Sequence, residues 1–178
     1  GNVILKENLL QLRSIAGLDF QRAVFLGSGP LFGIAHESHL KVQELSDGQD
    51  ICKYDSFLGF RHGPRAVVDK STLITYLLSN NGYSRQYELD LIKAIDESPT
   101  GAKSVGVGKD LDKLGIDFDF TILFPECLTD VPEEYYSVIY ILPAQIIGFY
   151  KSLDLGLEPD SPSKGGSISR VVQGVTIY

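Results

Sequence analysis

Short apolar runs alternate with amphipathic segments along most of the chain. Five runs rich in β-branched and aromatic residues predict strands at residues 22–27, 51–55, 72–78, 102–108 and 120–125. Their mostly apolar character is typical of strands that are covered on both faces. Between them, the periodicity predicts helices at residues 2–15, 30–47, 84–97 and 133–153. This alternation predicts an α/β protein with three layers, α/β/α, in which helices cover both faces of a five-stranded parallel sheet.

The 178 residues are enough for a single hydrophobic core. We expect an N-terminal helix in residues 1–21, an α/β domain in residues 22–154 and a C-terminal tail in residues 155–178. The composition changes sharply in the tail, "GLEPDSPSKGGSISRVVQGVTIY". Its Gly, Ser and Pro residues predict an irregular arm that ends in a short extended segment.

The charge argues against two classes of partner. Sixteen Lys and Arg against 23 Asp and Glu give a net charge of −7, whereas nucleic-acid and membrane-surface binding require clustered basic residues. The longest apolar run, "SVIYILPAQIIGFY", is short for a membrane span and contains Pro143 and Gln145. Lys6 and Glu7 interrupt the segment that a signal peptide would need to keep apolar. We therefore expect a cytoplasmic protein that binds neither membranes nor nucleic acid.

The cysteines and the glycine-containing loops indicate no cofactor. Cys52 and Cys127 are far apart and match no metal-binding spacing, so two buried thiols without a disulfide are expected in a reducing compartment. The loop "LGSGP", residues 26–30, matches neither the dinucleotide fingerprint nor a P-loop. We expect no metal, nucleotide or flavin.

Two polar loops follow predicted strands and are candidate phosphate sites. In "LGSGP", small residues such as Ser28 let backbone amides approach an anion at the start of the next helix; a plain tight turn is the alternative. In "SNNGYSRQYELD", residues 79–90, Ser84 is predicted to cap the following helix and Arg85 adds positive charge. An ordinary N-cap is the alternative there.

The helix in "LFGIAHESHLKVQELSDG" carries a charged stripe. Glu37, Lys41 and Glu44 recur at i, i+4 and i+7 and therefore share one face. On a generic helix this would be a solvated row of ion pairs that contributes little. The helix starts, however, at the carboxyl ends of the strands, where parallel sheets bind ligands. The stripe is therefore also a candidate substrate site.

The segment "FRHGPRAVV" places Arg61 and His62 just before a Gly-Pro turn. A lone histidine in a loop is more often structural than catalytic. An imidazole can nevertheless pass a proton to and from a sugar ring oxygen, and a carboxylate such as Glu44 can move a proton between adjacent carbons. Together these are the groups that aldose/ketose isomerisation needs.

Three blocks of sequence carry a resemblance: "GSGP...AHESHLKVQEL...YDSFLGFRHGP", "ILPAQIIGFYKSLDLGLEPDSP" and "RVVQGVTIY". They resemble the C-terminal half of the tagatose-6-phosphate ketose/aldose isomerase family, also described as galactosamine-6-phosphate deaminases. The chain is more distantly similar to the isomerase half of glucosamine-6-phosphate synthase. The resemblance covers residues 22–178 and implies a sugar isomerase (SIS) domain of flavodoxin type. Such domains normally occur twice per polypeptide and assemble as homodimers or larger homo-oligomers.

The resemblance also implies roles for particular residues. Glu44 aligns with the base that moves the proton between C1 and C2, and His62 with the histidine that opens the ring from a neighbouring subunit. Five further residues are expected to bind substrate: Ser28, Glu37, Lys41, Arg61 and Gln173. Gln173 stands where the synthase has its Schiff-base lysine, so no imine with the enzyme is expected. The family's Ser/Thr-rich phosphate loops lie in the other half.

The expected function is therefore a sugar-phosphate aldose/ketose isomerase, specifically a galactosamine-6-phosphate deaminase/isomerase that gives tagatose 6-phosphate. The alternative is a non-catalytic module that binds a sugar phosphate. A flavodoxin-like electron carrier is a third possibility, and it is disfavoured because no flavin-binding phosphate loop is evident.

Overall fold

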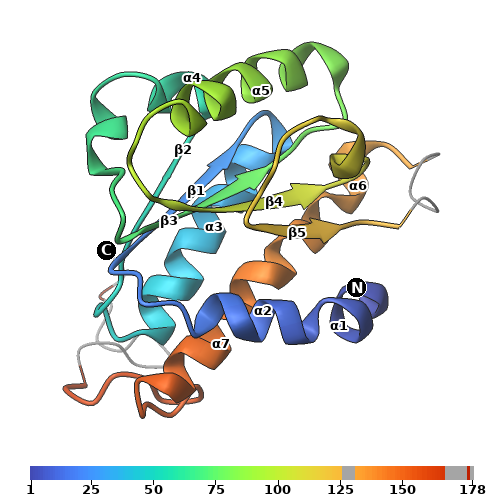
Figure 1. The fold of residues 1–178 in the computed structure, drawn as a ribbon. Coiled ribbons are helices and arrows are strands. Elements are labelled where there is room, and N and C mark those ends of the chain that lie inside the picture. Colours follow the sequence, from blue (N-terminus) through green and yellow to red (C-terminus); the bar gives the residue numbers. More distant parts are fainter. Residues whose placement is uncertain (126–130, 167–175, 177–178) are drawn as a thin grey trace.

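The computed structural model describes residues 1–125, 131–166 and 176. Its sheet has five parallel strands in the order β2-β1-β3-β4-β5 (Figure 1). The strands are β1 (Arg22–Gly27), β2 (Ile51–Asp55), β3 (Thr72–Leu77), β4 (Lys103–Gly108) and β5 (Phe120–Leu123). The five predicted strands and their parallel arrangement are confirmed.

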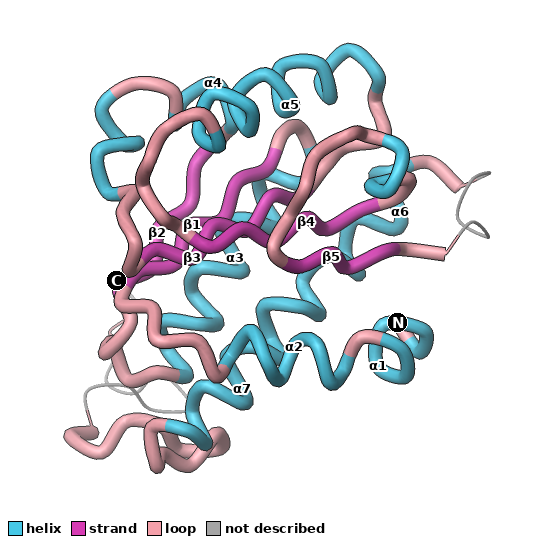
Figure 2. The backbone as a smooth tube through the Cα atoms, in the orientation of Figure 1, coloured by secondary structure: helices cyan, strands magenta, loops and turns pink. Residues whose placement is uncertain are grey.

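Helices cover both faces of the sheet (Figure 2). One face carries α1 (Asn2–Glu7), α2 (Leu9–Ala16), α3 (Pro30–Leu45) and α7 (Leu142–Asp154); the other carries α4 (Phe57–Phe60) and α5 (Gly82–Asp96). Side chains of β1 alternate between the two cores, because successive residues of a strand point to opposite faces. Ala23 and Phe25 join the core under α3 and α7, and Val24 and Leu26 the core under α5. The predicted three layers are therefore present.

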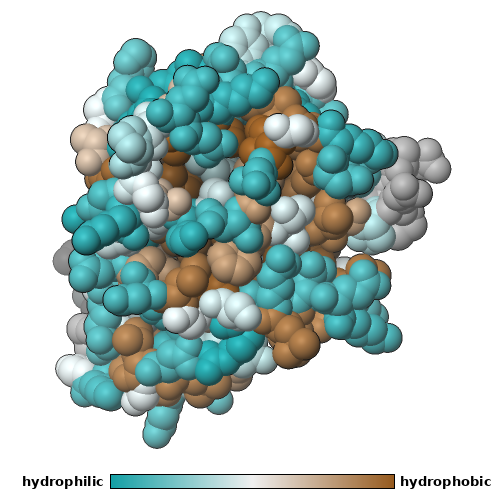
Figure 3. All heavy atoms as spheres, viewed as in Figure 1, coloured by the Kyte–Doolittle hydropathy of each residue, from teal (hydrophilic) through white to brown (hydrophobic). Residues whose placement is uncertain are grey.

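The hydrophobic residues that remain outside do not gather into one large patch on the face shown in Figure 3, where several apolar areas are separated by hydrophilic side chains. In the part of the chain that the structure describes, each helix is too short or too polar to span a bilayer.

The predicted N-terminal helix over residues 2–15 is two helices. The break falls at Asn8, whose backbone has φ −110° and ψ 0°. Asparagine competes for local hydrogen bonds and is a poor residue for a helix interior. The change of direction lets both pieces bury apolar side chains, namely Ile4 in α1 and Leu12 and Ile15 in α2. The prediction of one continuous helix is wrong for this reason.

The predicted helix over residues 133–153 is also interrupted. It comprises α6 (Glu133–Tyr136), a 3₁₀ segment (Ser137–Ile141) and then α7. Pro143 lies in the first turn of α7, where its missing N–H costs no hydrogen bond. A continuous α-helix through this proline would lose one hydrogen bond and bring its ring against the preceding turn. The chain therefore starts a new helix just before it.

The connection from β2 to β3 contains helical turns that the hydrophobic pattern did not predict. Ser56 caps α4 by accepting a hydrogen bond from the Gly59 N–H at 2.9 Å. A 3₁₀ helix, Gly63–Val67, follows. Both segments are too short to show a clear period, because one turn holds only three or four residues. They position Arg61 and His62.

Candidate functional site

The charged stripe predicted on α3 is confirmed. The Lys41 ammonium lies between two carboxylates, 3.4 Å from Glu37 Oε1 and 2.9 Å from Glu44 Oε2. The hydrogen bond from Lys41 to Glu44 raises the pKa of the lysine, and Glu37 adds to the effect. The side chain of Lys41 is 31% exposed, that of Glu37 49% and that of Glu44 40%, so a ligand can reach all three.

Close packing behind this stripe fixes the helix that carries it. On its inner side, α3 buries Ala35 and Val42 against the sheet. On its flank, α7 approaches so closely that a Cβ added at Gly148 would lie 2.8 Å from Leu45 Cδ1 and 3.1 Å from the Lys41 carbonyl oxygen. Glycine at this position allows the two helices to pack at short range. The helix that carries the stripe is thus held firmly between the sheet and α7.

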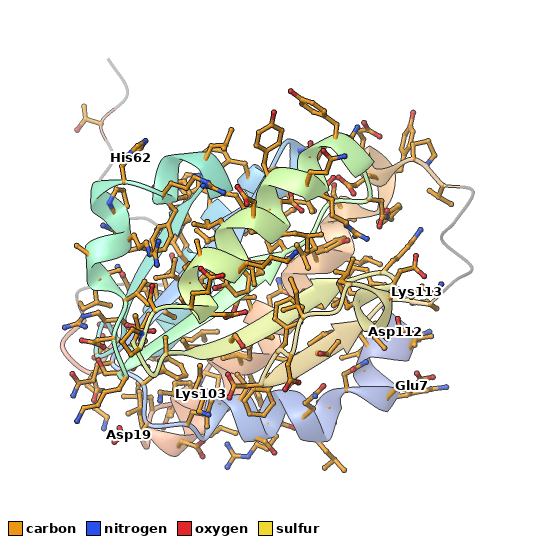
Figure 4. All side chains as sticks on the ribbon, turned by 45° about the horizontal axis from the view of Figure 1, so that its top comes forward. Glu7, Asp19, His62, Lys103, Asp112 and Lys113 are labelled. Carbon is orange, nitrogen blue, oxygen red and sulfur yellow. The ribbon has the colours of Figure 1, made fainter. Side chains whose placement is uncertain are left out.

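His62 lies apart from the stripe. It is an exposed residue between α4 and the 3₁₀ helix Gly63–Val67, on the opposite face of the sheet from α3 (Figure 4). Its neighbour Arg61 donates a hydrogen bond to Asp90 Oδ2 of α5 at 2.6 Å, which ties the loop to that helix. Within one chain, the structure does not bring His62 and Glu44 together.

Ser28 lines a different cleft, at the carboxyl ends of β1 and β3. This cleft has a volume of about 420 Å³ and is also lined by Ser79, Asn80, Asn81 and Glu133. From β1 and β3 the sheet continues towards opposite edges, so this is the topological switch point at which α/β sheets commonly bind ligands. Ser28 is therefore placed at a ligand position, but not beside Glu44.

The loop after β3 differs from its prediction in one detail. Asn81, rather than Ser84, is the N-cap of α5: its Oδ1 accepts from Tyr83 N–H at 3.0 Å and from Ser84 N–H at 3.1 Å. Because α5 begins at Gly82, Ser84 already lies within the first turn. Arg85 Nε donates to the Ser79 carbonyl oxygen at 2.6 Å, which places its positive charge at the loop as predicted.

Two predicted positions lie outside the described residues: Gln173, expected to bind substrate, and Cys127. Cys52 is buried and free, and burial is the main cause that raises the pKa of its thiol to about 12. A thiol with so high a pKa is unreactive at neutral pH. Across residues 1–125 and 131–166, three or more His, Cys, Asp or Glu side chains never converge as a metal site would require.

Glu88 is a buried carboxylate that the sequence analysis missed. It lies on α5, and its Oε2 accepts a hydrogen bond from the Ser79 N–H at 3.0 Å. Burial raises the pKa of Glu88 to about 7, although hydrogen bonds from Ser28 and Ser79 act in the opposite direction. The signal was present in the sequence, since Glu88 shares the i, i+3, i+4, i+7 stripe of α5 with Leu91, Ile92 and Ile95.

The folding stability is expected to fall with rising pH because of Glu88. Its pKa is about 7 in the folded chain and 4.5 ordinarily, so the folded state binds the proton more tightly. The stabilisation is complete below the ordinary pKa and is lost as the pH rises through the folded one, by about 2 kcal/mol between about pH 5 and pH 7. Urea unfolding of wild type and Glu88→Gln across this range measures it.

The glutamine in Glu88→Gln does not titrate, so this variant should lose the part of the pH dependence of its folding stability that Glu88 causes. Glu97→Gln, which changes an exposed carboxylate at the other end of α5, should keep it. Equal slopes in wild type and Glu88→Gln would contradict the prediction.

Comparison with known proteins adds the evolutionary context. No family model matches the chain. It is 37% identical over 178 residues to D-galactosamine-6-phosphate deaminase AgaS of Shewanella sp. (strain ANA-3), an alignment that covers 98% of this chain and 42% of the relative. The crystal structure of tagatose-6-phosphate ketose/aldose isomerase from Escherichia coli matches with a TM-score of 0.81 and 32% identity, over 97% of this chain and 45% of that one.

A more distant structure shares the fold alone. The C-terminal domain of glucosamine-fructose-6-phosphate aminotransferase from Francisella tularensis matches with a TM-score of 0.71 at 21% identity, over 84% of this chain and 41% of that one. The chain spans less than half the length of each of these three proteins.

The parallel sheet in the order β2-β1-β3-β4-β5, with helices on both faces, has the flavodoxin-like arrangement. Its match to the isomerase structures identifies it, among the proteins with this arrangement, as an SIS (sugar isomerase) domain. Within that class, the chain is homologous to the proteins described as tagatose-6-phosphate ketose/aldose isomerases and D-galactosamine-6-phosphate deaminases. The resemblance on which the sequence analysis depended is thereby confirmed.

Proposed function

We propose that the chain is the C-terminal SIS domain of an enzyme that converts galactosamine 6-phosphate into tagatose 6-phosphate and ammonia. The observation that carries this proposal is the Lys41 ammonium held between Glu37 and Glu44 on α3, in a chain 37% identical to a D-galactosamine-6-phosphate deaminase. A carboxylate beside a fixed cation is suited to removing and returning a proton next to developing negative charge.

Each of these residues has a role in one step of the proposed reaction. His62 assists opening of the sugar ring by moving a proton at the ring oxygen. Glu44 then takes the proton from C2 of the open aldehyde and returns it to C1, through an enolamine. Lys41 donates a 2.9 Å hydrogen bond to Glu44 and stabilises the negative charge that develops on the substrate oxygen at C1. Water finally adds to the C2 imine, and the C2–N bond breaks to release ammonia and leave the ketose.

The separation of Glu44 and His62 supports a site formed between subunits. Glu44 lies on α3, and His62 lies in the connection after α4, on the opposite face of the same sheet. We therefore propose that a homodimer or larger homo-oligomer brings His62 of one subunit to α3 of another. Ser28, Arg61 and Gln173 complete the proposed substrate contacts. A cytoplasmic location suits the free, buried thiol of Cys52.

The test is turnover of galactosamine 6-phosphate by the purified protein. We expect ammonia and tagatose 6-phosphate in equimolar amounts, measured by an ammonia assay and by NMR of the sugar. Glucosamine 6-phosphate, the C4 epimer, is the matched control for substrate choice. If the protein is stabilised against heat by the sugar phosphate but releases no ammonia, the proposed enzyme activity is wrong and the non-catalytic binding module is favoured instead.

A further inference from the structure

A pocket of about 230 Å³ lies at the amino ends of β4 and β5, at the opposite end of the sheet from the topological switch point. Asp96, the last residue of α5, lines it together with Asp117 and Asp119, which precede β5. Lys103 Nζ lies 2.6 Å from Asp119 Oδ1, and the Ser104 N–H donates to Asp119 Oδ2 at 2.9 Å. The protein itself therefore balances the charge of Asp119.

Asp96 and Asp117 leave this pocket with an excess of negative charge. Neither of them forms an ion pair with another residue that the structure describes. Both are exposed, so a ligand can reach them. Burial and the charge of Asp119 raise the pKa of Asp96, so the negative charges lie close enough to repel each other. Exposed carboxylates are common on protein surfaces; what distinguishes this pair is a buried hydroxyl behind it.

That hydroxyl belongs to Tyr76, and in the described part of the chain it has no hydrogen-bond partner. Tyr76 lies in β3 and is 0% exposed, with ring centroids 6.0 Å from Phe57 and 5.9 Å from Phe118. Phenylalanine would suit this apolar position, whereas an unpaired buried hydroxyl costs free energy. Tyr76 lines the pocket, and after burial the charge of Asp96 also raises its pKa. The hydroxyl therefore faces the side of the pocket where Asp96 lies.

The groups that line the pocket favour an organic cation. In residues 1–125 and 131–166, carboxylates do not converge as a metal ion would require, and two free carboxylates repel a phosphate. The volume is several times that of a water-sized ion such as ammonium. Hydroxyl groups of three further residues line it, namely Ser98, Thr100 and Ser104. A ligand that fits this lining combines a positive charge with hydroxyl groups.

We propose that this pocket is a second binding site, which takes a small primary amine that carries several hydroxyl groups. The ammonium group would face Asp96 and Asp117, and a ligand hydroxyl would form a hydrogen bond with the Tyr76 hydroxyl. The pocket contains none of the residues proposed for catalysis. Binding there is therefore independent of the proposed function, and its test needs no turnover.

The test is titration of the protein with galactosamine and with galactose, which has a hydroxyl in place of the ammonium. In NMR spectra, the amide signals of Gly101 and Ser104, which line the pocket, should shift with galactosamine and not with galactose. Asp96→Asn should raise the Kd for galactosamine by about tenfold. Tyr76→Phe keeps the ring, removes only the hydroxyl and should raise the Kd by about threefold to tenfold. Unshifted amides, or an unchanged Kd in either variant, would overturn the proposal.

Asp112→Asn is the matched control, because it removes the same charge from an exposed position that does not line the pocket. Asp112 follows β4, at the other end of this strand from Lys103 (Figure 4). Its Kd for galactosamine should equal that of wild type. An equal loss of affinity in Asp112→Asn, or equal amide shifts with ammonium chloride, would show only a general effect of charge, and the proposal would be wrong.

Discussion

Glu44→Gln should lower the rate of ammonia release from galactosamine 6-phosphate by about 100-fold to 10,000-fold, the usual contribution of a general acid or base. The amide keeps the size of the side chain but cannot accept the proton from C2. Folding should be little affected, because the Lys41–Glu44 ion pair is partly exposed and contributes at most about 1 kcal/mol. The measurements are kcat, KM and Tm, with the transfer of deuterium from heavy water to C1 of the product as a direct readout of the proton step.

Glu37→Gln is the matched control on the same helix. It removes the longer contact of Lys41, at 3.4 Å, and leaves the 2.9 Å contact with Glu44 in place. We expect a smaller decrease in rate and normal deuterium transfer in the product that forms. Full activity of Glu44→Gln would refute the role of this carboxylate in proton transfer.

Gly27→Ala should lower the free energy of unfolding by at least about 3 kcal/mol, at the upper end of the usual cost of overpacking. A Cβ at this last residue of β1 would lie 2.2 Å from the Leu31 carbonyl oxygen and 3.0 Å from the Phe32 nitrogen. Both are backbone atoms, so a change of side-chain rotamer cannot relieve the clash. The first turn of α3 would have to move away from the sheet. Urea unfolding, with the midpoint and slope compared with wild type, measures the loss.

Gly33→Ala, within α3 itself, should have the opposite effect on stability. A Cβ at Gly33 meets nothing within 4 Å, and the residue is exposed within α3. Alanine should therefore raise the stability by up to about 1 kcal/mol through its better helix propensity. If both alanine variants changed the stability in the same direction, close contact at Gly27 would not be the cause.

The sequence predicted the parts of the fold that depend on local periodicity. Mostly apolar runs located the five strands, because strands that are covered on both faces need apolar side chains on both. The breaks at Asn8 and before Pro143 were not predicted, although both residues are poor helix formers in an interior. The apolar pattern continued across each of them and concealed the change of direction.

In the candidate site too, the local contacts could be predicted from the sequence and the long-range contacts could not. The contacts among Glu37, Lys41 and Glu44 follow from helical spacing alone, and the sequence was sufficient to predict them. The contact of Glu133 with Ser79 joins residues 54 positions apart and depends on the packing of α6 over the end of β3. Likewise, the meeting of Glu44 with His62 remains a prediction, since it requires a second subunit.

The tight packing of α7 on α3 at Gly148 limits how this protein can adapt. Successive residues of an α-helix are offset by about 100° around the helix axis. A shift of α3 by one residue would therefore rotate Glu44 away from solvent and Val42 out of the core. Leu45 and the Lys41 carbonyl lie directly against the backbone of α7 at Gly148. There is no space between the two helices for such a rotation. New substrate preferences are therefore expected to arise in the loops around a stationary carboxylate, while the helix itself stays as it is.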